Sequence, residues 1–222
     1  MNIVIPGLHG NPDDPCIKII RDGLGTPSLT IDPKKGISQN GYGEYGNIES
    51  HMDSFRGFIE THSIDNPTII GHSLGALTAI VYASQNRVDG LMLINPQMGG
   101  KYDIRASRKN YRESTKNWKK QGFQVRTDQE GNTYRLPWDE YWEKSFRFEA
   151  VSLAKMITSR VVVIVGQDDL YINKDAIDLF LGNLNTQEYL LLDIEGPHVA
   201  KTQKELEILH SSVQQGISYL NS

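Results

Sequence analysis

The sequence predicts an α/β domain built on a mainly parallel sheet of about six strands, with one long insertion. Short β-branched runs alternate with helical patterns along the 222 residues, which is typical of a parallel sheet covered on both faces. One connection, from Gln97 to Ser159, spans 63 residues and is far too long for an ordinary loop. A chain of this length can form a single domain with a sizeable core.

Each expected strand is a short apolar run that ends near glycine, proline or polar residues. A helix is expected between the second and third strands, where apolar residues recur every three or four positions from Ile48 to Ile59. The same spacing from Leu206 to Leu220 predicts a helix near the C-terminus. The expected strands are Asn2–Ile5, Ser28–Ile31, Thr68–Ile70, Gly90–Ile94, Val161–Val165 and Glu188–Asp193.

The long connection is expected to carry structure of its own. Its pattern predicts a basic helix over 105–121, a β-hairpin with strands at 123–127 and 133–136, and an aromatic-rich helix over 138–148. We therefore expect residues 1–96 and 160–222 to form the core of the domain. Residues 97–159 are expected to form a cap or lid within it.

The amino-acid composition and net charge argue against several classes of protein. A net charge of −4 does not favour wholesale nucleic-acid binding, and Cys16, the single cysteine, excludes an intramolecular disulfide. No stretch approaches the roughly 18 apolar residues that span a bilayer. The first residues carry no basic leader pattern, so the expected location is the cytoplasm. No histidine pairs with another histidine or with the cysteine at metal-ligand spacing, so neither a metal nor a cofactor is expected.

The motif Gly71-His72-Ser73-Leu74-Gly75 is the most informative feature of the chain. It has the form G-x-S-x-G and lies between an apolar β-branched run and an Ala- and Leu-rich run. In this strand–turn–helix context the pattern indicates a nucleophile elbow, a tight turn that projects a serine hydroxyl from the edge of a sheet. Ser73 is therefore the candidate nucleophile.

A base and an acid follow in the order Ser…Asp…His. A serine hydroxyl needs a base to remove its proton, and a carboxylate to hold that base in the correct tautomer. Asp168 and Asp169 come after the expected strand 161–165, and His198 comes after the next strand. Both positions lie past the carboxyl ends of parallel strands, where open α/β sheets bind their ligands.

With these residues the chain resembles the α/β-hydrolase-fold serine hydrolases, a superfamily of esterases, lipases, thioesterases and acyl transferases. The resemblance implies a three-layer fold and, from its G-x-x-D pattern beginning at Gly166, a catalytic acid at Asp169 with Asp168 as the alternative. Some members carry the acid one strand earlier, where this chain has the neutral Asn95. The resemblance also implies His198 as the base.

The oxyanion hole implied by the resemblance is made by two backbone N–H groups. One belongs to Leu74, directly after the nucleophile. The other comes from the loop after the first strand, where two registers of Pro6–Pro12 are open. Leu8 is the preferred donor and Asn11 is the alternative. Many family members have two further strands before this loop, so a trimmed sheet of six strands is expected here.

The expected activity is hydrolysis of a carboxylic ester through a Ser73–His198–Asp169 triad and an acyl-enzyme intermediate. Two alternatives remain open: a thioesterase or acyltransferase that uses the same triad, and a hydrolase-like ligand receptor without turnover. The expected partner is a small-molecule acyl ester, with neither nucleic acid nor a membrane span.

Overall fold

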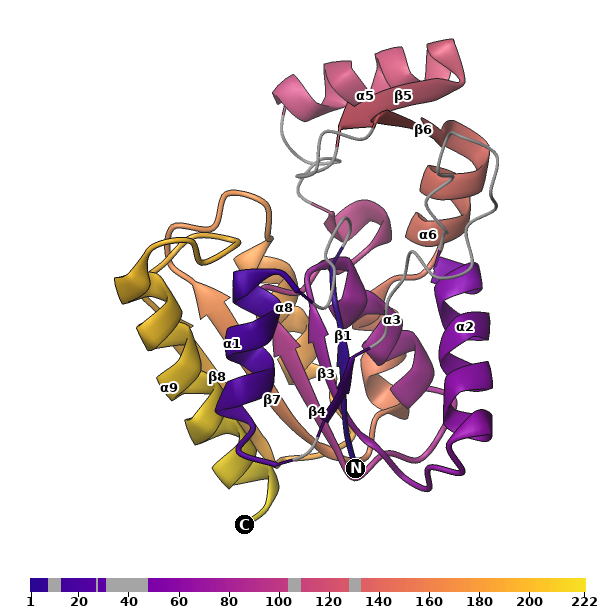
Figure 1. Ribbon diagram of the computed structural model, residues 1–222. Coiled ribbons are helices and arrows are strands. Elements are labelled where there is room, and N and C mark those ends of the chain that lie inside the picture. Colours follow the sequence, from indigo (N-terminus) through magenta and orange to yellow (C-terminus); the bar gives the residue numbers. More distant parts are fainter. Residues whose placement is uncertain (8–12, 27, 31–47, 104–108, 128–132) are drawn as a thin grey trace.

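A six-stranded parallel sheet forms the middle layer of the protein in the computed structural model (Figure 1). The structure describes residues 1–222 except 8–12, 27, 31–47, 104–108 and 128–132. The strand order is β2-β1-β3-β4-β7-β8, which confirms the predicted trimmed sheet. The strands are β1 Asn2–Ile5, β2 Ser28–Thr30, β3 Thr68–His72, β4 Gly90–Ile94, β7 Arg160–Gly166 and β8 Tyr189–Ile194.

The central strands are apolar because both of their faces are covered. Every residue of β3 and β4 is buried, as expected for strands inside a parallel sheet. Alternate residues point to opposite faces, so Ile69 and Leu91 join one buried cluster whereas Ile70 and Met92 join the other. The edge strand β8 is less covered, and Tyr189 is 43% exposed.

The helices cover the two faces of this sheet. α1 (Pro15–Gly23) and α9 (Gln203–Leu220) pack on one face, where Ile17 and Val213 belong to the same buried cluster. α2 (Ile48–Thr61), α3 (Leu74–Ala83) and α8 (Lys174–Gly182) cover the opposite face. Three layers result, which agrees with the predicted fold class (Figure 1).

The order of the strands reverses between β1 and β3. From β1 the chain goes to β2 on one side and then crosses to β3, β4, β7 and β8 on the other. In open α/β sheets such a switch point leaves a crevice at the carboxyl ends of the strands, and ligands bind there. The turn after β3 therefore lies where the fold favours a site.

The long connection 97–159 forms the elements between β4 and β7. Its hairpin is confirmed, with β5 and β6 paired in antiparallel register from Phe123↔Pro137 to Thr127↔Thr133. The predicted aromatic-rich helix begins instead as a π-helix. The elements are η1 Gly100–Tyr102, α5 Lys109–Gln121, β5 Phe123–Thr127, β6 Thr133–Pro137, η2 Trp138–Glu143, α6 Lys144–Phe146, α7 Ala150–Leu153 and η3 Ala154–Met156.

Three tryptophans join the parts of this connection. The rings of Trp118 and Trp138 meet edge to face at 5.6 Å between centroids, and Trp142 stacks on Trp138 at 5.4 Å. The indole Nε1–H of Trp118 donates to the carbonyl oxygen of Leu136 at 2.8 Å. Figure 1 shows α5 and the hairpin beyond the carboxyl ends of the sheet strands. No helix in the described part of the chain is long and apolar enough to cross a membrane.

Candidate active site

The turn between β3 and α3 presents Ser73 in a conformation that is rare for a residue with a side chain. Its φ is 54° and its ψ is −116°. Backbone hydrogen bonds hold the turn: the Ser73 N–H donates to Ile94 O at 2.9 Å, and the Gln97 N–H donates to Ser73 O at 3.2 Å. Backbone strain of this kind persists only where the surroundings enforce it. The predicted strand–turn–helix context of Ser73 is therefore present.

The two glycines of the motif allow segments of backbone to approach closely. A Cβ atom on Gly71 would lie 2.5 Å from the Cα of Ala76, and one on Gly75 would collide with the carbonyl oxygens of Ile5 and Pro6. Carbon atoms do not approach backbone this closely, so a larger residue at either position would push the turn apart. The motif thus packs α3 directly against β3 and the end of β1.

The carboxylate of Asp169 lies in the turn after β7. Its side chain is fully buried, and Oδ1 accepts a hydrogen bond from the Tyr171 N–H at 2.7 Å. The neighbouring Asp168 is exposed, and its N–H donates to Gly196 O at 3.1 Å. Of the two aspartates considered from the sequence, Asp169 is the one that faces His198.

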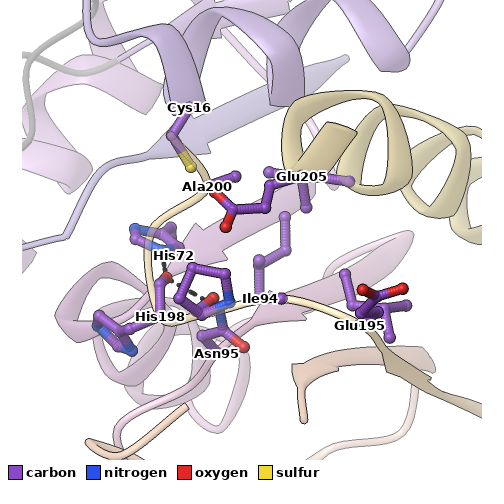
Figure 2. A pocket seen from close by; sticks show the side chains of 12 residues that line it. Cys16, His72, Ile94, Asn95, Glu195, His198, Ala200 and Glu205 are labelled. Carbon is purple, nitrogen blue, oxygen red and sulfur yellow. Dashed lines mark hydrogen bonds between the residues drawn. The ribbon is translucent and has the colours of Figure 1, made fainter. Parts of the chain in front are cut away.

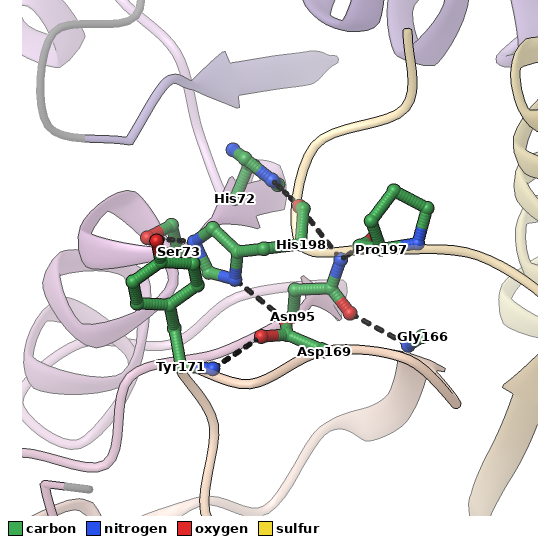
Figure 3. A network of polar contacts seen from close by, with 8 residues as sticks. All are labelled: His72, Ser73, Asn95, Gly166, Asp169, Tyr171, Pro197 and His198. Carbon is green, nitrogen blue, oxygen red and sulfur yellow. Dashed lines mark hydrogen bonds and ion pairs between the residues drawn. The ribbon is translucent and has the colours of Figure 1, made fainter. Parts of the chain in front are cut away.

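His198 follows β8 and connects the serine to the aspartate (Figure 3). Its Nδ1 lies 2.6 Å from Asp169 Oδ2, and its Nε2 lies 2.8 Å from Ser73 Oγ. A carboxylate can only accept, so Nδ1 carries the proton and Nε2 is left to accept from the serine hydroxyl. This arrangement is able to take the hydroxyl proton as Ser73 attacks an electrophile.

His72 is not part of this relay but lies beside it. It is 6% exposed, and its Nε2 lies 3.0 Å from the backbone carbonyl oxygen of His198, so that nitrogen is the protonated donor. Burial, and next the adjacent His198, lowers the pKa of His72 to about 4. The sequence does not predict this contact of His72, because the contact depends on where the His198 loop lies.

The contacts of Asn95 are also not predicted by the sequence. Asn95 follows β4 and is 6% exposed. Its side chain bonds to backbone groups of Gly166, Pro197 and His198 (Figure 3). The signal in the sequence is its position directly after a buried strand. The residue type by itself shows only that the side chain there is neutral.

Of the two predicted oxyanion donors, Leu74 lies within the described residues and Leu8 does not. Leu74 is the first residue of α3, and the first N–H groups of a helix have no partner within the helix. Leu8 and its alternative Asn11 lie outside the described residues. The preceding Gly7 is described, and a Cβ atom on it would lie 2.9 Å from the Cβ of Ser73. The start of that loop therefore lies against the nucleophile turn.

A small cavity lies behind the histidine loop (Figure 2). Its volume is about 10 Å³, and Cys16, His72, Asn95 and Glu205 are among the residues that line it. A cavity of this size is close to the minimum for one water molecule and excludes a substrate. Burial raises the pKa of the Cys16 thiol to about 11, which makes it a poor nucleophile. Among the described residues no three His, Cys, Asp or Glu side chains cluster as metal ligands would.

Comparison with known proteins agrees with this architecture. Residues 32–125 match a family model described as alpha/beta hydrolase fold. No curated protein sequence is significantly similar to the chain.

Solved structures match over nearly the whole chain at low identity. A monoacylglycerol lipase of Paleococcus ferrophilus is 16% identical with a TM-score of 0.73, covering 98% of this chain and 94% of its own. Est1E of Butyrivibrio proteoclasticus is 15% identical with a TM-score of 0.69, covering 99% and 87%. BpoC of Mycobacterium tuberculosis, which carries the name of a non-heme bromoperoxidase, is 14% identical with a TM-score of 0.74, covering 100% and 93%. These likenesses establish the fold.

Proposed function

Because this chain belongs by its fold to the α/β-hydrolase superfamily, we propose that it is a serine hydrolase that cleaves carboxylic esters. The observation that carries the proposal is the pair of short contacts made by His198, at 2.8 Å to Ser73 Oγ and 2.6 Å to Asp169 Oδ2. Fold alone would not support an activity, because one α/β fold hosts many chemistries. The proposal rests on the site.

The proposed reaction has two halves. Ser73 Oγ attacks the ester carbonyl while His198 Nε2 takes its proton, and His198 then gives that proton to the leaving alcohol. Water next attacks the acyl-enzyme, with His198 again as the base, and Ser73 is released. Asp169 holds the Nδ1–H tautomer and stabilises the imidazolium that forms in each half.

The oxyanion of each tetrahedral intermediate would be bound by backbone N–H groups. Leu74 supplies one donor from the start of α3, where the helix dipole also favours negative charge. Leu8 is proposed as the second donor and Asn11 as its alternative. Loss of one such donor typically costs about 10²–10³ in kcat.

Some of the structural neighbours are named for reactions of this class. One is a monoacylglycerol lipase, and Est1E has been solved with ferulic acid bound. We propose for this chain a small-molecule acyl ester as substrate, and a cap formed by residues 97–159. The support for the cap is the position of α5 and the hairpin beyond the carboxyl ends of the strands (Figure 1). A cytoplasmic location and the absence of a nucleic-acid partner stay predictions.

The test is hydrolysis of p-nitrophenyl esters from acetate to laurate by the wild type, by Ser73→Ala and by a serine control. Ser212 is a suitable control because it is 8% exposed, and its hydroxyl bonds only within α9 to Ile208 O at 2.8 Å. Turnover that disappears in Ser73→Ala and persists in Ser212→Ala supports the proposal. Turnover that survives in Ser73→Ala, or none on any ester, contradicts it.

A parallel assay with thioesters distinguishes ester hydrolysis from thioester hydrolysis by the same triad. A single slow acylation without further turnover would instead favour a ligand receptor. The acyl length with the highest kcat/KM gives the size of the acyl pocket.

A further inference from the structure

We propose that Asn95 is a positioning residue, one that holds the loops of the proposed base and acid in register through a single side-chain amide. The inference rests on the proposed function, because it assigns a role within that same site. The hydrogen bonds of the Asn95 side chain go to backbone groups and not to Ser73 Oγ or the imidazole of His198. Asn95 acts on the backbone that carries the base, and on the turn that leads to the acid.

One half of the amide binds the acid turn. Asn95 Oδ1 accepts a hydrogen bond from the Gly166 N–H at 2.7 Å, at the last residue of β7. The Asp169 N–H in turn donates to Gly166 O at 3.2 Å, which closes the turn that carries the carboxylate. The contact to Gly166 therefore fixes the point from which the acid projects.

The other half of the amide binds the base loop. Asn95 Nδ2 donates to the backbone oxygen of His198 at 2.9 Å and to that of Pro197 at 3.3 Å. His72 Nε2 donates to the same His198 oxygen at 3.0 Å (Figure 3). Two buried side chains from the ends of adjacent strands thus converge on one carbonyl group of the residue proposed as the base.

The amide of Asn95 meets two demands at once. The side chain must accept from an N–H group on one side and donate to carbonyl oxygens on the other. A carboxylate can accept but cannot donate, so it would face the oxygens of His198 and Pro197 unfavourably. Asn95 also has a φ of 44°, a conformation that asparagine, aspartate and glycine tolerate better than other residues.

The bonds of Asn95 extend a set of backbone hydrogen bonds between the same two loops. The Gln167 N–H donates to Ile194 O at 2.8 Å, and the Asp168 N–H donates to Gly196 O at 3.1 Å. These contacts join the exits of β7 and β8 as far as Gly196. The amide of Asn95 extends these contacts to His198 itself. The distances from His198 Nδ1 to Asp169 Oδ2 (2.6 Å) and from His198 Nε2 to Ser73 Oγ (2.8 Å) depend on where His198 is held.

The test compares Asn95→Asp, Asn95→Gly and a matched control. Asn95→Asp keeps the shape of the side chain, a residue type that tolerates the positive φ, and an oxygen that can accept from the Gly166 N–H. It loses the Nδ2 group that donates to the oxygens of His198 and Pro197. Asn95→Gly removes all three bonds without backbone strain. Asn183→Asp is the control, since Asn183 also donates to a backbone oxygen, that of Leu179 at 2.6 Å, at the exposed end of α8.

Two readouts are measured on each variant. The first is ester hydrolysis: kcat should fall roughly 10- to 100-fold in Asn95→Asp, with KM changed less than about twofold, because misplaced catalytic groups slow the chemical step. The second is the low-field proton resonance of His198 Nδ1–H in protein labelled with ¹⁵N-histidine. It should shift or broaden in both Asn95 variants and stay unchanged in Asn183→Asp.

Unchanged kcat together with an unchanged Nδ1–H resonance in both Asn95 variants would overturn the inference. The resonance does not require turnover, so it decides the role of Asn95 even if the wild type hydrolyses no ester and the proposed function fails. If neither variant folds, hydrogen exchange of the Asn95 side-chain amide in the wild type decides instead. Slow exchange of the Nδ2 protons supports the bonds to the loop, and exchange as fast as in a free amide contradicts them.

Discussion

Ser73 and Asn95 both have a positive φ, which is uncommon for residues other than glycine, at neighbouring strand ends. Their φ angles are 54° and 44°, and each directly follows a strand residue of a paired register, His72↔Ile94. Each N–H is also held by the next strand, at 2.9 Å to Ile94 O for Ser73 and 2.8 Å to Ile164 O for Asn95. The sheet itself thus enforces both conformations, and each side chain leaves its strand toward the His198 loop.

The two adjacent aspartates should differ sharply in their effect on activity. Asp169→Asn would leave the shape of the side chain but favour the wrong tautomer of His198, so we expect kcat to fall by about 10⁴. Asp168→Asn changes an exposed side chain, and kcat should stay within about twofold of the wild type. Steady-state kinetics of the two variants on one ester measures this. An equal loss of kcat in both variants, or a larger loss in Asp168→Asn, would contradict the assignment of Asp169 as the catalytic acid.

The buried His72 should make the protein less stable in mild acid. Its ordinary pKa of 6.5 falls to about 4 in the folded protein, so between these values the unfolded chain binds a proton that the folded one does not. The contribution of neutral, buried His72 to the free energy of unfolding should therefore be fully present above pH 6.5. It should decrease as the pH falls toward 4. The loss approaches about 3 kcal/mol for one such group.

Urea unfolding between pH 7 and pH 4 measures this dependence, with His72→Gln as the comparison. Burial also lowers the pKa of His51 to about 4, so a second contribution of the same sign should remain in the variant. We expect the slope of unfolding free energy against pH to be reduced, not abolished, in His72→Gln. An identical slope in both proteins would show that His72 does not contribute.

At the scale of elements, the elbow depends on how closely α3 approaches β1. Gly75→Ala would drive a methyl group into the backbone oxygens of Ile5 and Pro6, so we expect a loss of roughly 1–3 kcal/mol in unfolding free energy. Gly57→Ala is the matched control. Gly57 lies in α2 with open space around it, and alanine there should stabilise by about 0.5–1 kcal/mol.

Chemical denaturation of both variants separates the two effects, because the same substitution is made in each. Equal stability changes at Gly57 and Gly75 would mean that helix propensity alone governs these sites. The close approach of α3 to β1 would then have no energetic consequence.

The helices and strands were predicted most accurately where a single pattern of apolar residues determines them. The central strands have both faces buried, so their runs of β-branched residues were visible, and Gly90–Ile94 matches in both bounds. α1 was not predicted, because nine residues with only a few apolar positions give little periodicity. The π-helix η2 could not be predicted either, since an aromatic-rich run has a similar composition in α- and π-helices.

At the scale of the whole molecule, the connection 97–159 shares its core with the rest of the domain. Trp118, Leu136 and Trp138 belong to the same buried cluster as Ile69 and Leu91 of the sheet. The three tryptophans of the chain all lie in this connection. Tryptophan fluorescence therefore reports on 97–159 alone, whereas far-UV circular dichroism reports on all helices and strands.

We expect fluorescence and circular dichroism to give coincident unfolding curves in urea. A shared core makes the connection and the sheet unfold together in one cooperative transition. A fluorescence transition at clearly lower urea would instead mean that 97–159 unfolds as a separate unit.

The candidate site was predictable from the sequence where it depends on the order of its residues along the chain and on their positions after strands. Ser73 and Asp169 each follow a buried strand, His198 follows the edge strand β8, and parallel strands bring their carboxyl ends to one edge. The contacts of Asn95 and His72 were not predictable, because their partners are backbone groups of distant loops: the His198 oxygen for both residues, and the Gly166 N–H as well for Asn95. Backbone groups carry no residue signature, so the sequence does not mark them.

Covalent labelling shows whether Ser73 is an activated nucleophile. Wild-type protein, Ser73→Ala and His198→Ala would be treated with a fluorophosphonate, and the adduct would be located by mass spectrometry of intact protein and peptides. We expect a single adduct on Ser73 in the wild type, none in Ser73→Ala and strongly slowed labelling in His198→Ala. An adduct on another residue, or labelling of the wild type no faster than of His198→Ala, would contradict the proposal that Ser73 is an activated nucleophile.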